Sequence, residues 1–408
     1  MQNSKHSIFQ SLGVFYLTVV LVVLLGLSGC ENPGSVGAGL TDPGAEVTVD
    51  TMTISGIDTT YTNSFAGSQT YFSAGEFDDP IFGTTSVIGM DLPNLPTAQD
   101  TIRKDSKMYM RLSLDGNEVY GDSSASQDFD IYQIDEYWQA PDRLVNDAIK
   151  IDKSNKIASF SVAGQDSMDV QLSQSWYDKY YNYATDNSSE ADSLYEHKLG
   201  GLALVPANSK KIIPLKSKFT DFVIISPDSD TVSVGMRKWA YSLDRTNETY
   251  PAGSVPLYST YERILNFNLD LSNVTIEPST ISKAELIFYQ NDSAMTQSLQ
   301  SAPSSVQRPP EKNIRLHLAD PQNIPQNIDP GNPVTGGSYN ANDGGYHLNI
   351  TSIVQHILIS GTPEGQKFYV TMSNNGIVTP SLLYTGSDKV PLSKRPKIII
   401  TYLKNTSK

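Results

Sequence analysis

The chain has 408 residues, enough for two or three domains, and its 44 acidic residues against 30 basic ones give a net charge of −14. That charge repels a phosphate backbone, so the sequence predicts no nucleic-acid partner. The single cysteine excludes an intrachain disulfide. Its 22 tyrosines, 28 glycines and 23 prolines favour β-sheets joined by many turns.

The N-terminal region contains an apolar run, residues 14–27, which Lys5 precedes and Gly29-Cys30 follows. A basic region, an apolar region and a small-residue cleavage site are the parts of a secretory signal peptide. The run is shorter than the roughly 20 apolar residues of a membrane-spanning helix. The alternative is an uncleaved N-terminal membrane helix that begins a few residues earlier. We expect a signal peptide over residues 1–29, cleaved between Gly29 and Cys30.

Cys30 is the one thiol of the chain, and a thiolate is the nucleophile that accepts a thioether-linked diacylglycerol. Residues 27–30 (Leu-Ser-Gly-Cys) resemble the lipobox of bacterial lipoproteins. The resemblance implies that Cys30 becomes the acylated first residue of the mature chain, and two acyl chains hold a protein stably on a bilayer. Glu31, in place of aspartate, implies an outer-membrane lipoprotein, in either leaflet. The expected membrane contact is this lipid anchor.

The rest of the chain is organised as a tether followed by short strands. Residues 30–46 are rich in glycine and proline, which predicts a flexible tether with a reach of roughly 20 Å. Beyond it, short alternating or β-branched runs between turn residues are typical of a β-sandwich or barrel. The clearest runs are residues 47–54, 108–114, 129–134, 202–205, 222–225, 264–269, 284–289, 314–318, 368–372 and 398–402.

An internal repeat relates the two halves of the chain. The corresponding segments are residues 107–114 and 283–290, 129–134 and 314–318, 170–180 and 348–358, 202–205 and 368–372, and 222–225 and 398–402. In the third pair the apolar spacing changes from period two to i, i+4, which predicts a strand that runs into a short helix. We therefore expect an all-β protein of two tandem jelly-roll-like β-sandwich modules, each with a short helix, over residues 47–228 and 229–405.

Two family resemblances accompany this repeat. Residues 262–270, 281–289, 347–355 and 395–402 resemble the DNRLRE-type modules of secreted bacterial proteins, which are related to carbohydrate-binding jelly-roll domains. Residues 71–83, with their Asp-Pro-Ile-Phe-Gly end, are similar to a lipoprotein family of unknown function in Gram-negative bacteria, and that similarity covers nearly the whole chain. Neither resemblance supplies a catalytic residue. Both imply the fold rather than an activity.

The most aromatic stretch spans residues 176–183 and is the candidate glycan-binding segment. Exposed tyrosine rings stack on sugar rings, whose edges remain free for hydrogen bonds. Trp176 and Tyr180 occupy the repeat positions of Val354 and Leu358, so we expect these two in the core. The expected glycan-binding residues are Tyr177, Tyr181 and Tyr183.

Glu76, Asp78 and Asp79 stand together before Pro80 and form the candidate metal site. Their hard oxygen ligands suit a structural calcium ion, the one cofactor that we consider. The alternative is an Asp-Pro turn with solvated carboxylates, because no D-x-D-x-D-G pattern is present. The histidines of the mature chain show no zinc-binding spacing; they are His197, His317, His347 and His356.

No catalytic motif supports an enzyme. The chain lacks G-x-S-x-G, P-loop and glycine-fingerprint patterns, and scattered acidic pairs are the expected background of an acidic β protein. The sequence therefore predicts a non-catalytic cell-envelope lipoprotein that binds an extracellular glycan or polymer. The alternative is a structural lipoprotein that scaffolds another envelope protein.

Overall fold

The computed structural model describes residues 45–62, 64–97, 100–186, 188, 190–319, 334–361 and 367–405. The expected signal peptide, the lipidation site Cys30 and most of the tether lie outside these residues. The chain divides into two compact units, one of residues 1–49 with 401–408 and one of residues 50–400. Within the described part, no helix is both long and apolar enough to cross a membrane.

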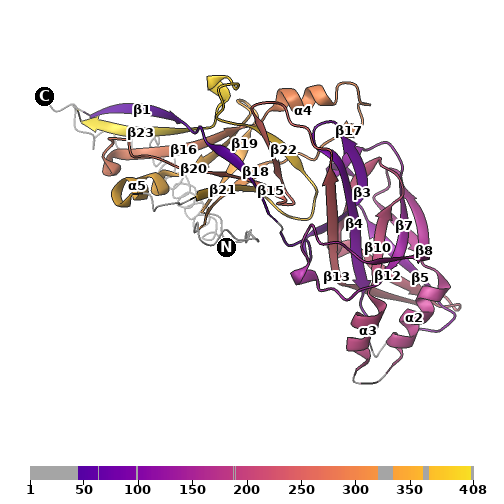
Figure 1. Cartoon of the computed structure of the whole chain (residues 1–408). Coiled ribbons are helices and arrows are strands. Elements are labelled where there is room, and N and C mark those ends of the chain that lie inside the picture. The colour runs from indigo at the N-terminus through magenta and orange to yellow at the C-terminus, as the bar shows by residue number, and fades with distance from the viewer. Residues whose placement is uncertain are drawn as a thin grey trace, which may run out of the picture. The chain divides into compact units, whose positions relative to one another are not determined.

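Strands are the predominant secondary structure of the described chain (Figure 1). The strands of the N-terminal half are β1 (Ala45–Thr53), β2 (Ile57–Tyr61), β3 (Tyr71–Asp79), β4 (Gly83–Pro93), β5 (Lys107–Ser113), β6 (Tyr120–Asp122), β7 (Gln127–Ile134), β8 (Ile151–Val162), β9 (Ser167–Gln171), β10 (Leu202–Pro206), β11 (Lys211–Lys216) and β12 (Asp221–Ile225). Its helices are α2 (Gln174–Ala184) and α3 (Ala191–Leu199), with 3-10 turns at η1 (Gly116–Glu118), η2 (Ala140–Asp142) and η3 (Ser217–Phe219).

The C-terminal half is built in the same way. Its strands are β13 (Thr231–Thr246), β14 (Ser254–Tyr258), β15 (Arg263–Phe267), β16 (Ile281–Tyr289), β17 (Val306–Gln307), β18 (Asn313–Ala319), β19 (Thr335–Asn340), β20 (Gly345–Asn349), β21 (Lys367–Met372), β22 (Pro380–Tyr384) and β23 (Lys397–Asn405). Its helices are α4 (Asp292–Ser298) and α5 (Thr351–Ser360), with 3-10 turns at η4 (Pro278–Thr280) and η5 (Leu392–Lys394).

The strands of the described residues form three sheets. One has nine strands in the order β1-β23-β16-β20-β19-β18-β21-β15-β2. The second has twelve: β17-β6-β11-β3-β4-β13-β12-β5-β9 in one path, with β10, β7 and β8 branching from β4. The third is the pair β14-β22. The pairs with a described register, such as β13 with β4 and β18 with β21, are antiparallel. The prediction of an all-β, sandwich-like fold is confirmed.

Segments that the sequence repeat relates make the same pairings in both halves. Strand β5 lies between β12 and β9, as β16 lies between β23 and β20. Strand β10 lies between β7 and β4, as β21 lies between β18 and β15. Helix α2 follows β9, and α5 follows β20. The tandem duplication stays a prediction, and these pairings favour it.

Sheet membership cuts across the predicted module boundary between residues 228 and 229. Strand β13 follows that boundary, yet it pairs with β12 and β4 of the N-terminal half. Strand β2 precedes it, yet it pairs with β15, and β1 is the neighbour of β23 in the nine-stranded sheet. The N-terminal half therefore contributes β1 and β2 to the sheet of the C-terminal half, which contributes β13 and the short β17 in return.

A large cluster of buried apolar side chains lies mainly in the N-terminal half and is joined by side chains of β13 and by Val378. It includes Phe72, Val87, Phe129, Trp176 and Tyr180. Trp176 and Tyr180 are fully buried, so the prediction that they belong to the core is confirmed. In α5, Val354 and Ile357 are the buried residues. In both helices the apolar residues at i and i+3 or i+4 face the core, as the spacing requires.

Candidate ligand-binding pocket

Helix α2 carries the three tyrosines that the sequence suggested for glycan binding. Its first turn is capped by Ser173, whose hydroxyl accepts a hydrogen bond from the Trp176 amide. Tyr177 is fully buried, and its hydroxyl donates to the backbone oxygen of Arg103 over 2.6 Å. The expectation that Tyr177 is exposed is therefore wrong, because α2 packs against both β5 and α3.

Tyr181 and Tyr183 are partly buried and lie beside the same core. The ring centroid of Tyr181 lies 6.2 Å from that of Tyr177, and that of Tyr183 lies 5.9 Å from that of Tyr195 on α3. Their rings thus pack against other tyrosines. A glycan-binding role for this pair stays a prediction, which the packing does not favour.

The three carboxylates proposed for calcium are held apart on β3 and have other partners. Asp78 accepts a hydrogen bond from the Thr84 hydroxyl (2.6 Å), and Glu76 accepts one from the Ser209 hydroxyl. Glu76 and Asp78 are two residues apart and lie on one face of the strand. Asp79 lies on the opposite face, because successive side chains of a strand alternate between its faces. Among the described residues, no group of three or more His, Cys, Asp and Glu is placed to hold a metal ion. The predicted calcium ligands are therefore not brought together.

Asp79 has a structural role. Its carboxylate accepts hydrogen bonds from Arg308 (2.7 and 2.8 Å) and from the backbone amides of Ile81 (2.8 Å) and Phe82 (3.0 Å). Burial alone raises the pKa of Asp79, but the Arg308 guanidinium and these amides outweigh burial and hold the pKa below its usual value. The Asp-Pro turn is present, with a buried, paired carboxylate in place of the solvated one that the sequence suggested.

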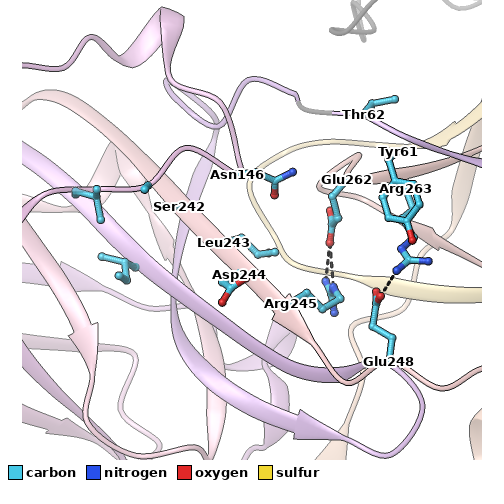
Figure 2. Close-up of a pocket in the computed structure, with 13 residues that line it drawn as sticks. Tyr61, Thr62, Asn146, Ser242, Leu243, Asp244, Arg245, Glu248, Glu262 and Arg263 are labelled. Atoms are coloured by element: carbon cyan, nitrogen blue, oxygen red, sulfur yellow. Dashed lines mark hydrogen bonds and ion pairs between the residues drawn. The ribbon is translucent and has the colours of Figure 1, made fainter.

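A pocket with a cavity volume of about 540 Å³ lies where β2, β13 and β15 meet the loop after Leu144 (Figure 2). Its polar lining residues are Tyr61, Thr62, Asn146, Ser242, Asp244, Arg245, Glu248, Glu262 and Arg263. Figure 2 shows Asn146 on one side, Tyr61 and Arg263 on the other, and the pair of Arg245 with Glu262 between them. All of these residues belong to the compact unit of residues 50–400.

The first ion pair of the pocket joins Arg245 of β13 to Glu262, which directly precedes β15. Nε and Nη2 of Arg245 donate to one carboxylate oxygen of Glu262 over 3.0 and 2.8 Å, and Nη1 donates to Thr85 over 2.5 Å. The other oxygen accepts from the Thr260 hydroxyl. The guanidinium also lies 3.9 Å from the ring centroid of Tyr258. With side chains only 4% and 9% exposed, the pair forms a closed, neutral floor.

The second ion pair joins Arg263 of β15 to Glu248. The other carboxylate oxygen of Glu248 accepts from the Tyr258 hydroxyl over 2.8 Å, and that hydroxyl is 2.8 Å from the hydroxyl of Tyr250. Burial raises the pKa of both Tyr250 and Tyr258, so both stay protonated at neutral pH and can donate. The network therefore fixes Arg263 in one position.

Tyr61 completes the wall of the pocket. In the register of β2 with β15, Tyr61 lies opposite Arg263, and the guanidinium carbon is 4.4 Å from the Tyr61 ring centroid. Cation–π contacts of this kind hold a ring in place. The Tyr61 side chain nevertheless remains 70% exposed. A large aromatic face is thus presented at a polar pocket.

One carboxylate of the pocket is not paired with an arginine of the pocket. Glu248 and Glu262 are each engaged by an arginine, whereas Asp244 is exposed and accepts no hydrogen bond from the residues that the structure describes. Asn146 is also exposed. This arrangement offers an aromatic face and hydrogen-bonding groups, which suits recognition of a polyhydroxylated ligand.

Sequence reasoning missed this pocket because its residues come from five separate stretches of the chain. Only Glu262 and Arg263 fall in a segment that the sequence analysis singled out, residues 262–270 of the DNRLRE-type resemblance. Tyr61 lies on β2 and Arg245 lies on β13, and both strands pair across the predicted module boundary. No local sequence pattern predicts such a pairing. A strand pairing across the boundary was the missing piece of information.

No protein-family model and no curated protein matches the chain. Among solved structures, a chain of the Macrobrachium rosenbergii nodavirus is 9% identical and covers 89% of this chain and 98% of its own length, with a TM-score of 0.11. A chain of infectious bursal disease virus, Gx strain, is 11% identical over 90% and 77%, with the same TM-score. PNGF-II is 7% identical and covers 84% of this chain and 65% of its own length, also with a TM-score of 0.11. Scores this low carry no argument about fold or function.

Proposed function

We propose that the protein is a non-catalytic lipoprotein of the cell envelope that binds an extracellular glycan or polymer in the pocket at Tyr61. The observation that carries the proposal is the Tyr61 ring, 70% exposed and held 4.4 Å from the Arg263 guanidinium at a pocket of about 540 Å³. A sugar ring buries its C–H face on such an aromatic ring, and its hydroxyls then reach polar groups at the edge.

The network behind Tyr61 supports binding because it orders the site before a ligand arrives. Arg263 is held by Glu248, and Glu248 is held in turn by the Tyr258 hydroxyl. Tyr61 is itself paired through β2 to β15. A preorganised aromatic wall loses little conformational freedom on binding, so more of the contact energy appears as affinity.

The binding experiment uses the purified mature chain and a panel of soluble polysaccharides in affinity electrophoresis. We expect Tyr61→Ala to weaken binding about tenfold or more, which corresponds to about 1.4 kcal/mol. Tyr137→Ala is the matched control, because Tyr137 is 40% exposed and does not line the pocket. Equal losses in the two variants would contradict the site, and a wild-type protein that binds no polysaccharide would contradict the function.

The envelope location rests on Cys30 and the preceding segment, and it has its own test. Metabolic labelling with a fatty acid should mark the wild-type protein, and globomycin should leave it unprocessed. Cys30→Ser should lose the label, because a hydroxyl does not replace the thiolate in thioether formation. A Cys30→Ser variant that keeps the label would overturn the anchor.

A further inference from the structure

We infer that the pocket at Tyr61 selects glycans without acidic groups, so that uncharged polysaccharides bind and their carboxylated or sulfated counterparts are rejected. This inference rests on the proposed function and adds the chemical class of the ligand. It follows from which charged side chains of the pocket already form ion pairs with one another.

The positive charge of each arginine in the pocket is already paired with a glutamate. All three guanidinium nitrogens of Arg245 donate to Glu262 or Thr85, and the side chain is only 4% exposed. Arg263 is paired with Glu248, and the side chains of that pair are 15% and 12% exposed. An acidic sugar therefore meets no uncompensated positive charge, and displacing either carboxylate from its arginine would leave that carboxylate buried without its partner.

The remaining charge of the pocket is negative. Three carboxylates, of Asp244, Glu248 and Glu262, face two guanidinium groups, and Asp244 is the exposed one. Like charges within a few ångströms repel, and water screens that repulsion only in part. The chain as a whole carries −14, which also slows the approach of a polyanion at low ionic strength.

The same groups suit hydroxyls. A carboxylate accepts hydrogen bonds at both oxygens, so Asp244 can receive two sugar hydroxyls. Tyr61 supplies the face on which the ring rests. An uncharged sugar therefore meets complementary groups at each point where an acidic one meets repulsion.

The test measures affinity electrophoresis of the mature full-length chain against two sets of polymers at low and moderate salt. The uncharged set is dextran, mannan, xylan and mixed-linkage β-glucan, and the acidic set is alginate, polygalacturonate, carboxymethyl cellulose and hyaluronan. We expect binding to the uncharged set that Tyr61→Ala weakens about tenfold. Asp244→Asn should reduce the discrimination against the acidic set by about tenfold at low salt, whereas Asp270→Asn, an exposed carboxylate outside the pocket, should leave it unchanged.

The outcomes separate the two claims. Binding to acidic polymers that depends on Tyr61 overturns the inference and leaves the proposed function standing. Discrimination that Asp244→Asn does not change also overturns the inference, because the charge of the pocket then does not set it. Binding to no polymer, or binding that Tyr61→Ala leaves intact, overturns the proposed function and the inference together.

Discussion

The two halves of the molecule share their strand pairings but differ in the strand that each receives from the other. Strand β13 is continuous over 16 residues and pairs with β4 from Thr84 to Pro93, with one irregularity between Met236 and Lys238. The equivalent segment is divided into β1 and β2, and β2 pairs with β15 over only five residues. The C-terminal half thus receives the less regular strand, and the candidate site is found there.

The pairings also align individual positions. If Leu202 of β10 is matched to Phe368 of β21, their ladder partners Asp91 and Phe267 correspond. One strand further, the same registers match Leu243 of β13 to Tyr61 of β2. Leu243 is 4% exposed, whereas Tyr61 is 70% exposed. The same position in the same ladder therefore serves the core in one half and a surface site in the other.

The largest expected effect comes from breaking the buried ion pair between Arg245 of β13 and Glu262, which precedes β15. Arg245→Ala leaves Glu262 buried without its guanidinium, so we expect a loss of about 3–5 kcal/mol in the free energy of unfolding. Urea unfolding followed by circular dichroism measures it. The control is Arg111→Ala, whose pair with Asp169 is 45% and 44% exposed and should cost under about 1 kcal/mol. Equal losses would show that burial does not distinguish the two pairs.

The next effect compares the helices at equivalent places in the two halves. Trp176→Ala in α2 removes a fully buried indole, and we expect a loss of about 3–5 kcal/mol. Val354→Ala in α5 removes two buried methyl groups and should cost about 2 kcal/mol. Thermal or urea unfolding of both variants gives the difference. A larger loss from Val354→Ala would mean that α5, rather than α2, is the better packed helix.

At Asp91 we expect a smaller change in the free energy of unfolding, and a gain rather than a loss. Its carboxyl is fully buried and has no hydrogen-bond partner among the described residues, whereas Phe267 stacks on Phe368 with ring centroids 5.4 Å apart. Desolvation raises the pKa of Asp91 well above its usual value. The folded state therefore binds the proton more tightly, and wild-type stability falls as the pH rises from the unfolded pKa towards the folded one.

Asp91→Asn removes that titration, so the variant should gain about 1–3 kcal/mol over the wild type at pH 7. The gain should shrink as the pH falls below about 4, where the wild-type carboxyl becomes protonated in the unfolded state as well as in the folded one. Urea unfolding between pH 3 and pH 8 measures both curves. Parallel curves would contradict the raised pKa, and a destabilised variant at pH 7 would reveal a partner for Asp91.

The smallest effect on stability is expected at Tyr61. Tyr61→Leu introduces the residue of the equivalent position, Leu243, and removes one exposed cation–π contact, so stability should fall by about 0.5–1 kcal/mol. Polysaccharide binding should fall about tenfold in the same variant. Loss of stability above about 2 kcal/mol would show that Tyr61 is a structural residue.

The sequence predicts those features that depend on local periodicity. The strands and the burial of Trp176 and Tyr180 follow from residue spacing alone, and the structure confirms them. Tyr177 was assigned to the surface because the pattern shows one helix face and not the neighbours of the helix. Helix α3 covers a second side of α2, where Tyr195 packs 6.0 Å from Tyr180.

Features that depend on distant partners were not accessible from the sequence. Asp79 looked like a calcium ligand, and its actual partner, Arg308, lies 229 residues away. Asp91 gave no signal, because an aspartate in a strand is normally at the surface. The sequence does not predict the pocket for the same reason. Its residues come together only because β2 pairs with β15 and β13 pairs with β4, each across the predicted module boundary.

The most direct test of the central claim is hydrogen–deuterium exchange of the mature protein with and without a saturating polysaccharide. The proposal predicts protection of residues 57–62, 244–248 and 262–265, which surround Tyr61, and unchanged exchange in α2. Protection confined to residues 174–184, or no protection anywhere at a polysaccharide concentration that saturates binding, would contradict it.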